Sequence, residues 1–194
     1  MPVFSFLLFV IITSFTPGPN NFMAMAFANK HGMKKTVKFS LGVGVGFFII
    51  ALLCSCFNIF LTTVMPIIEF PLTIFGVVYM LYLAFKILTS KGNTNSNNQD
   101  KQNFFLIGVL VQFVNPKGIL FGITVVSTFI LPYYTSYSSY FLFSLFLGMV
   151  GIVSTFSWSL FGSVFQKFLV KYRRSFNAVM AALLVYSAFS ILVK

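Results

Sequence analysis

The chain has 194 residues, of which 58% are hydrophobic and 8% are charged, and its formal net charge is +11. This composition leaves too few polar residues to cover a soluble surface, which excludes an ordinary water-soluble domain. No charged residue occurs over 39–68 or 118–166, and these runs are long enough for one and two spanning helices of roughly 20 residues. The sequence therefore predicts an all-α integral membrane protein, with the lipid bilayer as its first partner.

The apolar runs predict six transmembrane helices. In chain order they cover 3–29, 39–61, 70–89, 104–131, a segment within 137–165, and 176–193. Helix one is expected to be interrupted at 16–20, where two prolines flank a glycine, because proline lacks an N–H and clashes with the preceding turn. Helix four, if continuous, would be roughly 42 Å long, beyond the ~30 Å hydrocarbon core. An interruption at Asn115-Pro116 resolves the excess, and a strong tilt is the alternative.

A polar, asparagine-rich stretch at 91–103 lies near the midpoint of the chain and indicates a cytoplasmic linker. It divides a single membrane domain into a first three-helix repeat, 1–90, and a second, 104–194. Each repeat has an odd number of spans, so the second must be inverted relative to the first, as in many secondary transporters. The predicted fold is thus six transmembrane helices in two inverted three-helix repeats.

Eleven of the thirteen basic residues lie in or beside the predicted loops one, three and five, whereas loops two and four, about 62–69 and 132–136, have none. Short basic clusters between apolar runs orient a protein in a membrane. They are not a nucleic-acid footprint, so nucleic acid is not an expected partner. The positive-inside rule places both termini outside the cytoplasm.

The two interruptions occupy matching positions in the two halves, which is the best pointer in a sequence to a transporter's substrate site. Broken backbone persists at membrane depth only where it is buried in protein or lines a cavity. The first break also places the N-terminus of a half-helix near mid-membrane, which favours a carboxylate. The predicted substrate-binding residues are Thr16, Pro17, Gly18, Pro19, Asn20, Asn21, Gln112, Asn115, Pro116, Lys117 and Gly118. The alternative is a pair of structural proline kinks whose asparagines satisfy their own backbone.

Lys117 is the one basic residue well inside an apolar run. A charge at that depth is costly unless it is paired or hydrated, which makes it a functional candidate by default. Its ammonium group would attract the carboxylate of a zwitterion, or would titrate during proton-coupled transport. The alternative is a lysine that only satisfies carbonyl groups freed by a break.

Four further residues are candidates for a substrate path or for coupling. Gly42 and Gly46 form a G-x-x-x-G pattern, which suits close helix packing, a dimer face between two copies of the chain, or a path. Trp158 either lines the path or packs. Glu69, one of two acids, would bind an amine or carry a proton, although interfacial acids are more often merely solvated.

The chain has one histidine and two acids, too few for a hydrolytic triad or for a metal site. It contains no phosphate-binding loop for ATP. We therefore expect neither an enzyme nor a cofactor, and transport energy would come from a gradient or from the substrate's own concentration.

Three features together resemble the LysE/RhtB superfamily of amino-acid exporters. They are Thr16-Pro17-Gly18-Pro19-Asn20, a basic loop with His31-Gly32, and Asn115-Pro116-Lys117. The resemblance covers nearly the whole chain, and it implies a bacterial inner-membrane protein that exports small amino acids, with proton antiport as the expected mechanism.

Within that superfamily, several stretches look closest to the branch that exports cysteine and O-acetylserine. They are Thr16–Asn21, Leu52-Leu53-Cys54, Gln112–Asn115 with Lys117, and Ser127–Pro132. Exporters of cationic amino acids carry an acid in helix two, and this chain has none around Gly46-Phe47-Phe48, so the expected cargo is a small neutral zwitterion. Homoserine or threonine export, and a membrane subunit that transports nothing, are the alternatives.

Overall fold

The computed structural model describes residues 1–89, 102–165 and 171–192, and all of the regular structure in these ranges is helical. The elements in chain order are α1 (Val3–Phe15), α2 (Pro19–His31), α3 (Met33–Cys56), α4 (Asn58–Thr89), α5 (Phe104–Phe113), α6 (Pro116–Val125), the π-helix η1 (Val126–Ile130), α7 (Tyr137–Val164) and α9 (Arg173–Leu192). The predicted linker lies outside the described residues except for Gln102 and Asn103. The Asn103 side chain accepts a hydrogen bond from the Leu106 N–H and so caps α5.

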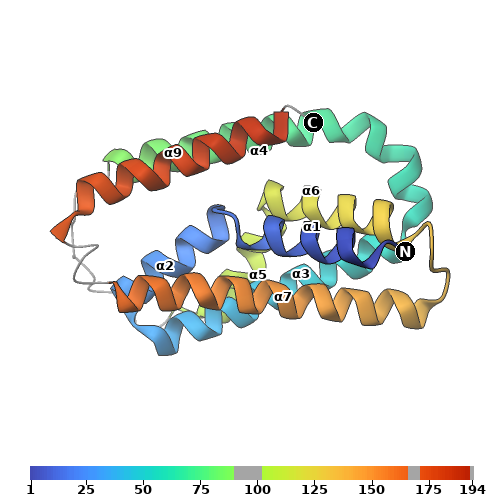
Figure 1. Cartoon of the computed structure of the whole chain (residues 1–194), viewed down its shortest axis with the longest axis horizontal. Helices are drawn as coiled ribbons and strands as arrows, with labels where there is room; N and C mark the ends of the chain where they lie inside the picture. The colour runs from blue at the N-terminus through green and yellow to red at the C-terminus, as the bar shows by residue number, and fades with distance from the viewer. Residues whose placement is uncertain (90–101, 166–170, 193–194) are drawn as a thin grey trace.

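Both predicted interruptions are present. The first helix is divided into α1 and α2, which meet at 48°, and the fourth into α5 and α6, which meet at 65°. The prediction of a loop at 62–69 is wrong, because α4 begins at Asn58, directly after Phe57, and runs through this segment. The segment is mostly apolar, and α4 accommodates its prolines by curving, as Figure 1 shows, rather than by ending.

Three of the described helices are long and apolar enough to cross a membrane: α3, the Phe70–Thr89 part of α4, and α7. The number rises to five if each bent pair counts as one span. With 20 residues, α9 has the length of a span but is not among these helices. The fold is therefore that of an all-helical, multi-pass membrane protein, and the arrangement as six spans in two inverted repeats stays a prediction.

Glycines on α3 allow it to pack closely between two neighbours. A methyl group on Gly42 would collide with the carbonyl oxygen of Phe105 in α5, and one on Gly46 would lie 2.9 Å from the Cβ of Gln112. On the opposite face, a methyl group on Gly44 would lie 2.8 Å from the carbonyl oxygen of Gly148 in α7. Gly42 and Gly46 thus hold α5 within the chain, which is the packing role that the G-x-x-x-G pattern suggested.

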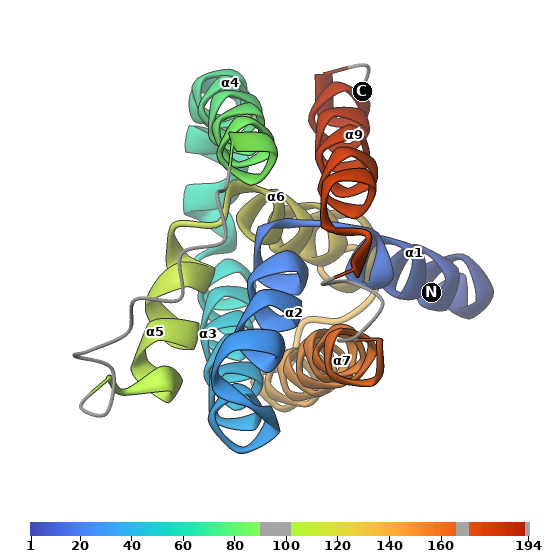
Figure 2. The ribbon, with the colours of Figure 1, turned by 90° about the vertical axis from the view of Figure 1, so that its left-hand side faces the viewer.

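Helices α4 and α9 lie side by side, apart from the bundle that the other helices form (Figures 1 and 2). The Asn177 side chain donates to the Ile87 carbonyl oxygen at 3.0 Å and joins the two helices. This pair contacts the rest of the protein along α2, where Phe22 and Met25 pack against it, and at the two breaks. Gly76 of α4 packs so closely on Pro116 that a methyl group there would lie 2.7 Å from the proline Cβ, and Ser187 of α9 donates to the Pro17 carbonyl.

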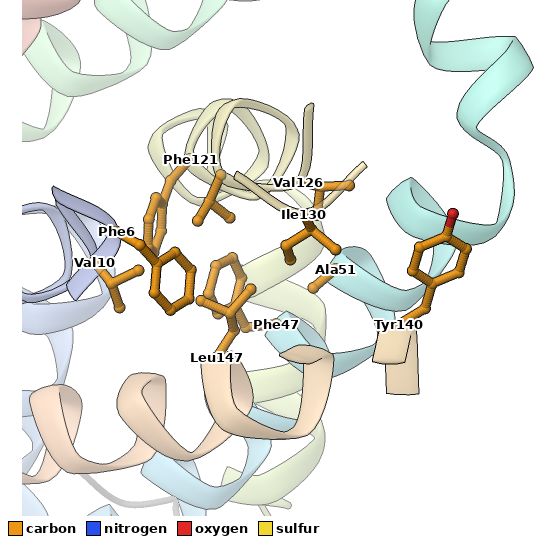
Figure 3. Close-up of a cluster of buried hydrophobic side chains, with 10 residues drawn as sticks. Phe6, Val10, Phe47, Ala51, Phe121, Val126, Ile130, Tyr140 and Leu147 are labelled. Carbon is orange, nitrogen blue, oxygen red and sulfur yellow. The ribbon is translucent and has the colours of Figure 1, made fainter. Parts of the chain in front are cut away.

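Two apolar clusters lie on either side of the breaks. The larger, here called the Phe6 cluster, joins α1, α3, α6, η1 and α7 and is drawn in Figure 3. Its buried members are Phe6, Val10, Phe47, Ala51, Phe121, Val125, Val126, Ile130, Tyr140 and Leu147. The smaller, the Phe39 cluster, joins α2, α3 and α5 and contains Ala24, Phe39, Val43 and Phe104.

Candidate functional site

The prolines at the two breaks explain why the backbone there is extended rather than helical. Proline disfavours the helical conformation in the residue before it. Accordingly Thr16, Gly18 and Asn115, each followed by proline, have ψ angles of 149°, 172° and 100°. Pro19 and Pro116 are then the first residues of α2 and α6, where a missing N–H costs nothing. Each break is thus an extended residue followed by a proline that starts a new helix.

The end of α1 leaves carbonyl groups without helical partners, and side chains from other helices supply donors. The Ser14 carbonyl oxygen accepts hydrogen bonds from the Asn21 amide at 2.9 Å and from the Ser154 hydroxyl at 2.6 Å. The Phe15 carbonyl oxygen accepts one from the Trp158 indole N–H at 3.2 Å. Helices α2 and α7 therefore hold the first break from two sides.

The next two carbonyl groups are held mainly by Lys117, the second residue of α6. Its ammonium nitrogen lies 3.1 Å from the carbonyl oxygens of both Thr16 and Pro17 and 2.8 Å from the Thr16 hydroxyl. The Pro17 carbonyl also accepts from Ser187 at 3.0 Å. The absence of a side chain at Gly18 makes room, because a methyl group there would lie 3.0 Å from the Lys117 Cδ. A cation on one break thus neutralises the negative end of α1 at the other.

The N-termini of α2 and α6 lack side-chain caps. The N-cap residue of α2 is Gly18, which has no side chain to serve as a cap. The N-cap residue of α6 is Asn115, whose side chain forms no hydrogen bond to the helix. An uncapped helix N-terminus presents free N–H groups and a partial positive charge, and so attracts a carboxylate. Both N-termini belong to the wall of one cavity.

This cavity is partly open to its surroundings and has a volume of about 60 Å³. It is lined by residues of α1, the first break, α2, α3, α5, the second break, α6 and α7. They are Thr13, Ser14, Gly18, Asn20, Asn21, Val43, Phe47, Gln112, Asn115, Lys117, Gly118, Phe121, Gly151, Ser154 and Thr155. None of these lining residues is acidic.

The wall combines polar groups with aromatic rings. The Asn20 amide donates to the Gln112 side-chain oxygen, which joins α2 to α5 across the two halves of the chain. Phe47 and Phe121 stack with ring centroids 5.1 Å apart and belong to the Phe6 cluster. Val43, on the other side of the cavity along α3, belongs to the Phe39 cluster. The cavity therefore lies between the two apolar clusters.

Of the residues predicted to bind substrate, seven line the cavity: Gly18, Asn20, Asn21, Gln112, Asn115, Lys117 and Gly118. Thr16, Pro17, Pro19 and Pro116 form the breaks without lining it. Among the path candidates, Gly42 and Gly46 lie against α5, and Trp158 donates to the first break. The Glu69 side chain lies outside the described part of the structure.

Sequence reasoning missed Thr13, Ser14, Phe47, Phe121 and the α7 residues around Ser154. Hydroxyl groups within an otherwise apolar helix were the available signal for Ser154 and Thr155. No pattern in the chain distinguishes Phe47 or Phe121 from the other 26 phenylalanines, because only the packing of α3 on α6 brings these two rings together.

An all-helical membrane protein with a cavity between two interrupted helices has features that many secondary transporters share. The comparison with known proteins agrees: residues 11–194 match the family described as LysE type translocator, and the chain belongs to this family.

Individual relatives cover nearly the whole chain. A protein of Escherichia coli strain K12 named cysteine/O-acetylserine efflux protein is 37% identical over 184 residues, 95% of this chain and 94% of the relative. The protein of the same name in Salmonella typhimurium strain LT2 is 36% identical over the same shares. No solved structure matches the chain.

Proposed function

We propose that this protein exports small neutral amino acids or their derivatives, such as cysteine and O-acetylserine, across the bacterial inner membrane. The cavity at the two breaks is the proposed binding site. Its position supports the proposal, because transporter substrates bind near mid-membrane where helices are discontinuous. The names of the relatives support the cargo.

One observation carries the binding hypothesis: two uncapped helix N-termini and the Lys117 ammonium group meet at one cavity. All three favour negative charge, and a carboxylate is the negative group that every amino acid has. Lys117 attracts that carboxylate, and the free N–H groups of the first turns of α2 and α6 receive it.

The charge of the site favours a neutral cargo. No lining residue is acidic, and the described part of α3 at the cavity carries only glycine, phenylalanine and aliphatic residues between Gly42 and Phe48. A second positive charge on lysine or arginine would stand near Lys117 without a partner, which is costly at low dielectric. A zwitterion adds no net charge and avoids this cost.

In alternating access, the helices that meet in one apolar cluster would move apart while those of the other cluster stay packed. In one state the Phe6 cluster would close the cavity toward the end with the N-terminus and the α6–α7 connection, which the positive-inside rule assigns to the outside. In the other state the Phe39 cluster would close it toward the basic loop after α2. Proton antiport is the proposed energy source, and two inverted three-helix repeats are the proposed symmetry that relates the two states.

The test is efflux from cells preloaded with labelled cysteine, O-acetylserine, threonine and lysine, compared between wild type, Lys117→Ala and the control Lys38→Ala. Lys38 is an exposed lysine of the basic loop region and lies outside the cavity. We expect wild type and Lys38→Ala to export cysteine or O-acetylserine, and Lys117→Ala to lose export while remaining in the membrane. Normal export by Lys117→Ala would refute the assigned site.

Homoserine or threonine is the second candidate cargo, favoured by the hydroxyl groups of Ser154 and Thr155 in the cavity wall. Export of threonine rather than cysteine in the same assay would retain the site and change the cargo. Failure to export any of the labelled amino acids, with the protein present in the membrane, would favour a membrane subunit that transports nothing.

A further inference from the structure

We propose that Asn20 and Asn115 form the receiving site for the ammonium group of the cargo, so that the protein selects molecules with a free α-amino group. This inference rests on the proposed function and specifies the chemistry of the same cavity. It starts from two side-chain oxygens that the fold buries without a partner.

Asn20 and Asn115 are 6% and 5% exposed, and both line the cavity. The Oδ1 atom of each is buried and accepts no hydrogen bond from any described residue. A buried carbonyl-type oxygen without a donor is destabilising, and native proteins keep few such groups. Two of them at one cavity indicate that a donor arrives with the ligand.

The fold holds both residues in place for this role. The Asn20 amide N–H donates to Gln112, so its Oδ1 is the group left for a ligand. Asn115 is the N-cap of α6, yet its side chain does not bond to the helix, so it too remains available. Gly118 keeps the neighbourhood open, because a methyl group there would lie 3.2 Å from the Asn115 amide nitrogen.

The charges of the cavity also require acceptors of this kind. An ammonium group carries three N–H donors and needs oxygen partners when it leaves water. No lining residue is acidic, so neutral carbonyl-type oxygens must receive it. Asn20 lies in the first turn of α2 and Asn115 immediately precedes α6, beside the N–H groups that favour the carboxylate. The two groups of an α-amino acid are attached to one carbon, so their binding sites must be this close.

The predicted selectivity separates two isomers. O-acetylserine has a free ammonium group and N-acetylserine has an amide in its place, while their atomic compositions are identical. Cysteine likewise has a free ammonium group, whereas N-acetylcysteine has an amide in its place. The compound 3-mercaptopropionate retains the thiol and carboxylate of cysteine without any amine. A site that recognises only size and carboxylate would accept all of them.

The experiment is uptake of labelled cysteine into proteoliposomes of the full-length protein, with these compounds as competitors in a mildly acidic buffer that keeps the acetyl group on oxygen. We expect cysteine and O-acetylserine to compete at least tenfold better than N-acetylserine, N-acetylcysteine and 3-mercaptopropionate. Asn20→Ala and Asn115→Ala should each raise the KM for cysteine about tenfold or more, in line with loss of a hydrogen bond to a charged group. Neither should change the weak inhibition by 3-mercaptopropionate.

Ser144→Ala is the matched control, because Ser144 is as buried and its hydroxyl is likewise without a partner among the described residues, but it does not line the cavity. It should leave the KM unchanged. Asn115→Asp, which keeps the oxygen acceptors, should retain cysteine affinity if Asn115→Ala fails to fold. Equal competition by N-acetylserine and O-acetylserine, in a wild-type protein that transports cysteine, would overturn the ammonium site and leave the proposed function intact. A wild-type protein that transports no amino acid would overturn both.

Discussion

The ammonium nitrogen of Lys117 lies 2.8 Å from the hydroxyl oxygen of Thr16, which joins the two interrupted helices directly. Two carbonyl oxygens complete its contacts, so the three N–H donors of the lysine are all directed at the first break. A cargo carboxylate that reaches Lys117 must therefore compete with the end of α1. The Lys117 side chain donates hydrogen bonds to the first break and also lines the cavity. A structural role at the break and a role in cargo binding are therefore compatible.

Thr16→Val tests this competition. The substitution keeps the size and shape of the side chain and removes one of three acceptors of Lys117, so the lysine is freer to meet a carboxylate. We expect the apparent affinity for cysteine to rise three- to tenfold. The free energy of unfolding in detergent should fall by about 1–2 kcal/mol. An unchanged or weaker affinity, measured by uptake kinetics, would mean that Lys117 does not exchange between the break and the cargo.

Gly118→Ala should abolish transport without unfolding the protein. The added methyl group would overlap the Gln112 amide and lie 3.2 Å from the Asn115 amide, which displaces two polar groups of the cavity wall. Gly151→Ala is the control, because its methyl group would meet nothing closer than 3.7 Å. Uptake assays should show loss for the first variant and retained transport for the second, with equal amounts of protein in the membrane. Loss of transport in both would point to a general intolerance of methyl groups at the cavity.

Ser187→Ala should slow transport. Ser187 provides the hydrogen bond from the α4–α9 pair to the first break, at 3.0 Å from the Pro17 carbonyl oxygen. Its loss removes about 1 kcal/mol of coupling between that pair and the break. We expect a lower maximal rate with little change in KM, because Ser187 does not line the cavity. Ser190→Ala is matched to it, since among the described residues Ser190 donates to the Ser187 carbonyl within α9. Equal rates in the two variants would contradict a coupling role.

Trp158 should report cargo binding by its fluorescence. It is the only tryptophan in the chain, and its indole N–H donates to the Phe15 carbonyl at the first break. A cargo carboxylate that draws the Lys117 ammonium group away from Thr16 would move a positive charge away from the Trp158–Phe15 hydrogen bond, and so change the surroundings of the indole. We expect saturable quenching or enhancement with cysteine under tryptophan-selective excitation, and none with lysine or in Lys117→Ala. A flat titration at concentrations that saturate transport would contradict the link between the cavity and the break.

Much of the organisation follows from local chemistry. Apolar runs of spanning length predict membrane helices, and Pro17, Pro19 and Pro116 predict the two interruptions, because an X-Pro pair disfavours a continuing helix whatever surrounds it. The family resemblance rested on the same residues. The prediction of a loop at 62–69 was wrong, because a mostly apolar segment with a single proline, here Pro66, curves or breaks according to its packing, which the local sequence does not reveal.

The candidate site, like the fold, was predicted in part from local sequence and depends in part on packing. Hydropathy and the covalent geometry of proline are enough to predict that the chain enters a membrane, where two of its helices break, and which polar residues lie at the breaks. The three-dimensional packing was needed to find that Lys117 reaches Thr16 and Pro17, that Asn20 meets Gln112, and that Phe47 and Phe121 form part of the cavity wall. Those contacts join residues some 70 to 100 positions apart, so they depend on how the helices pack together and not on any local preference.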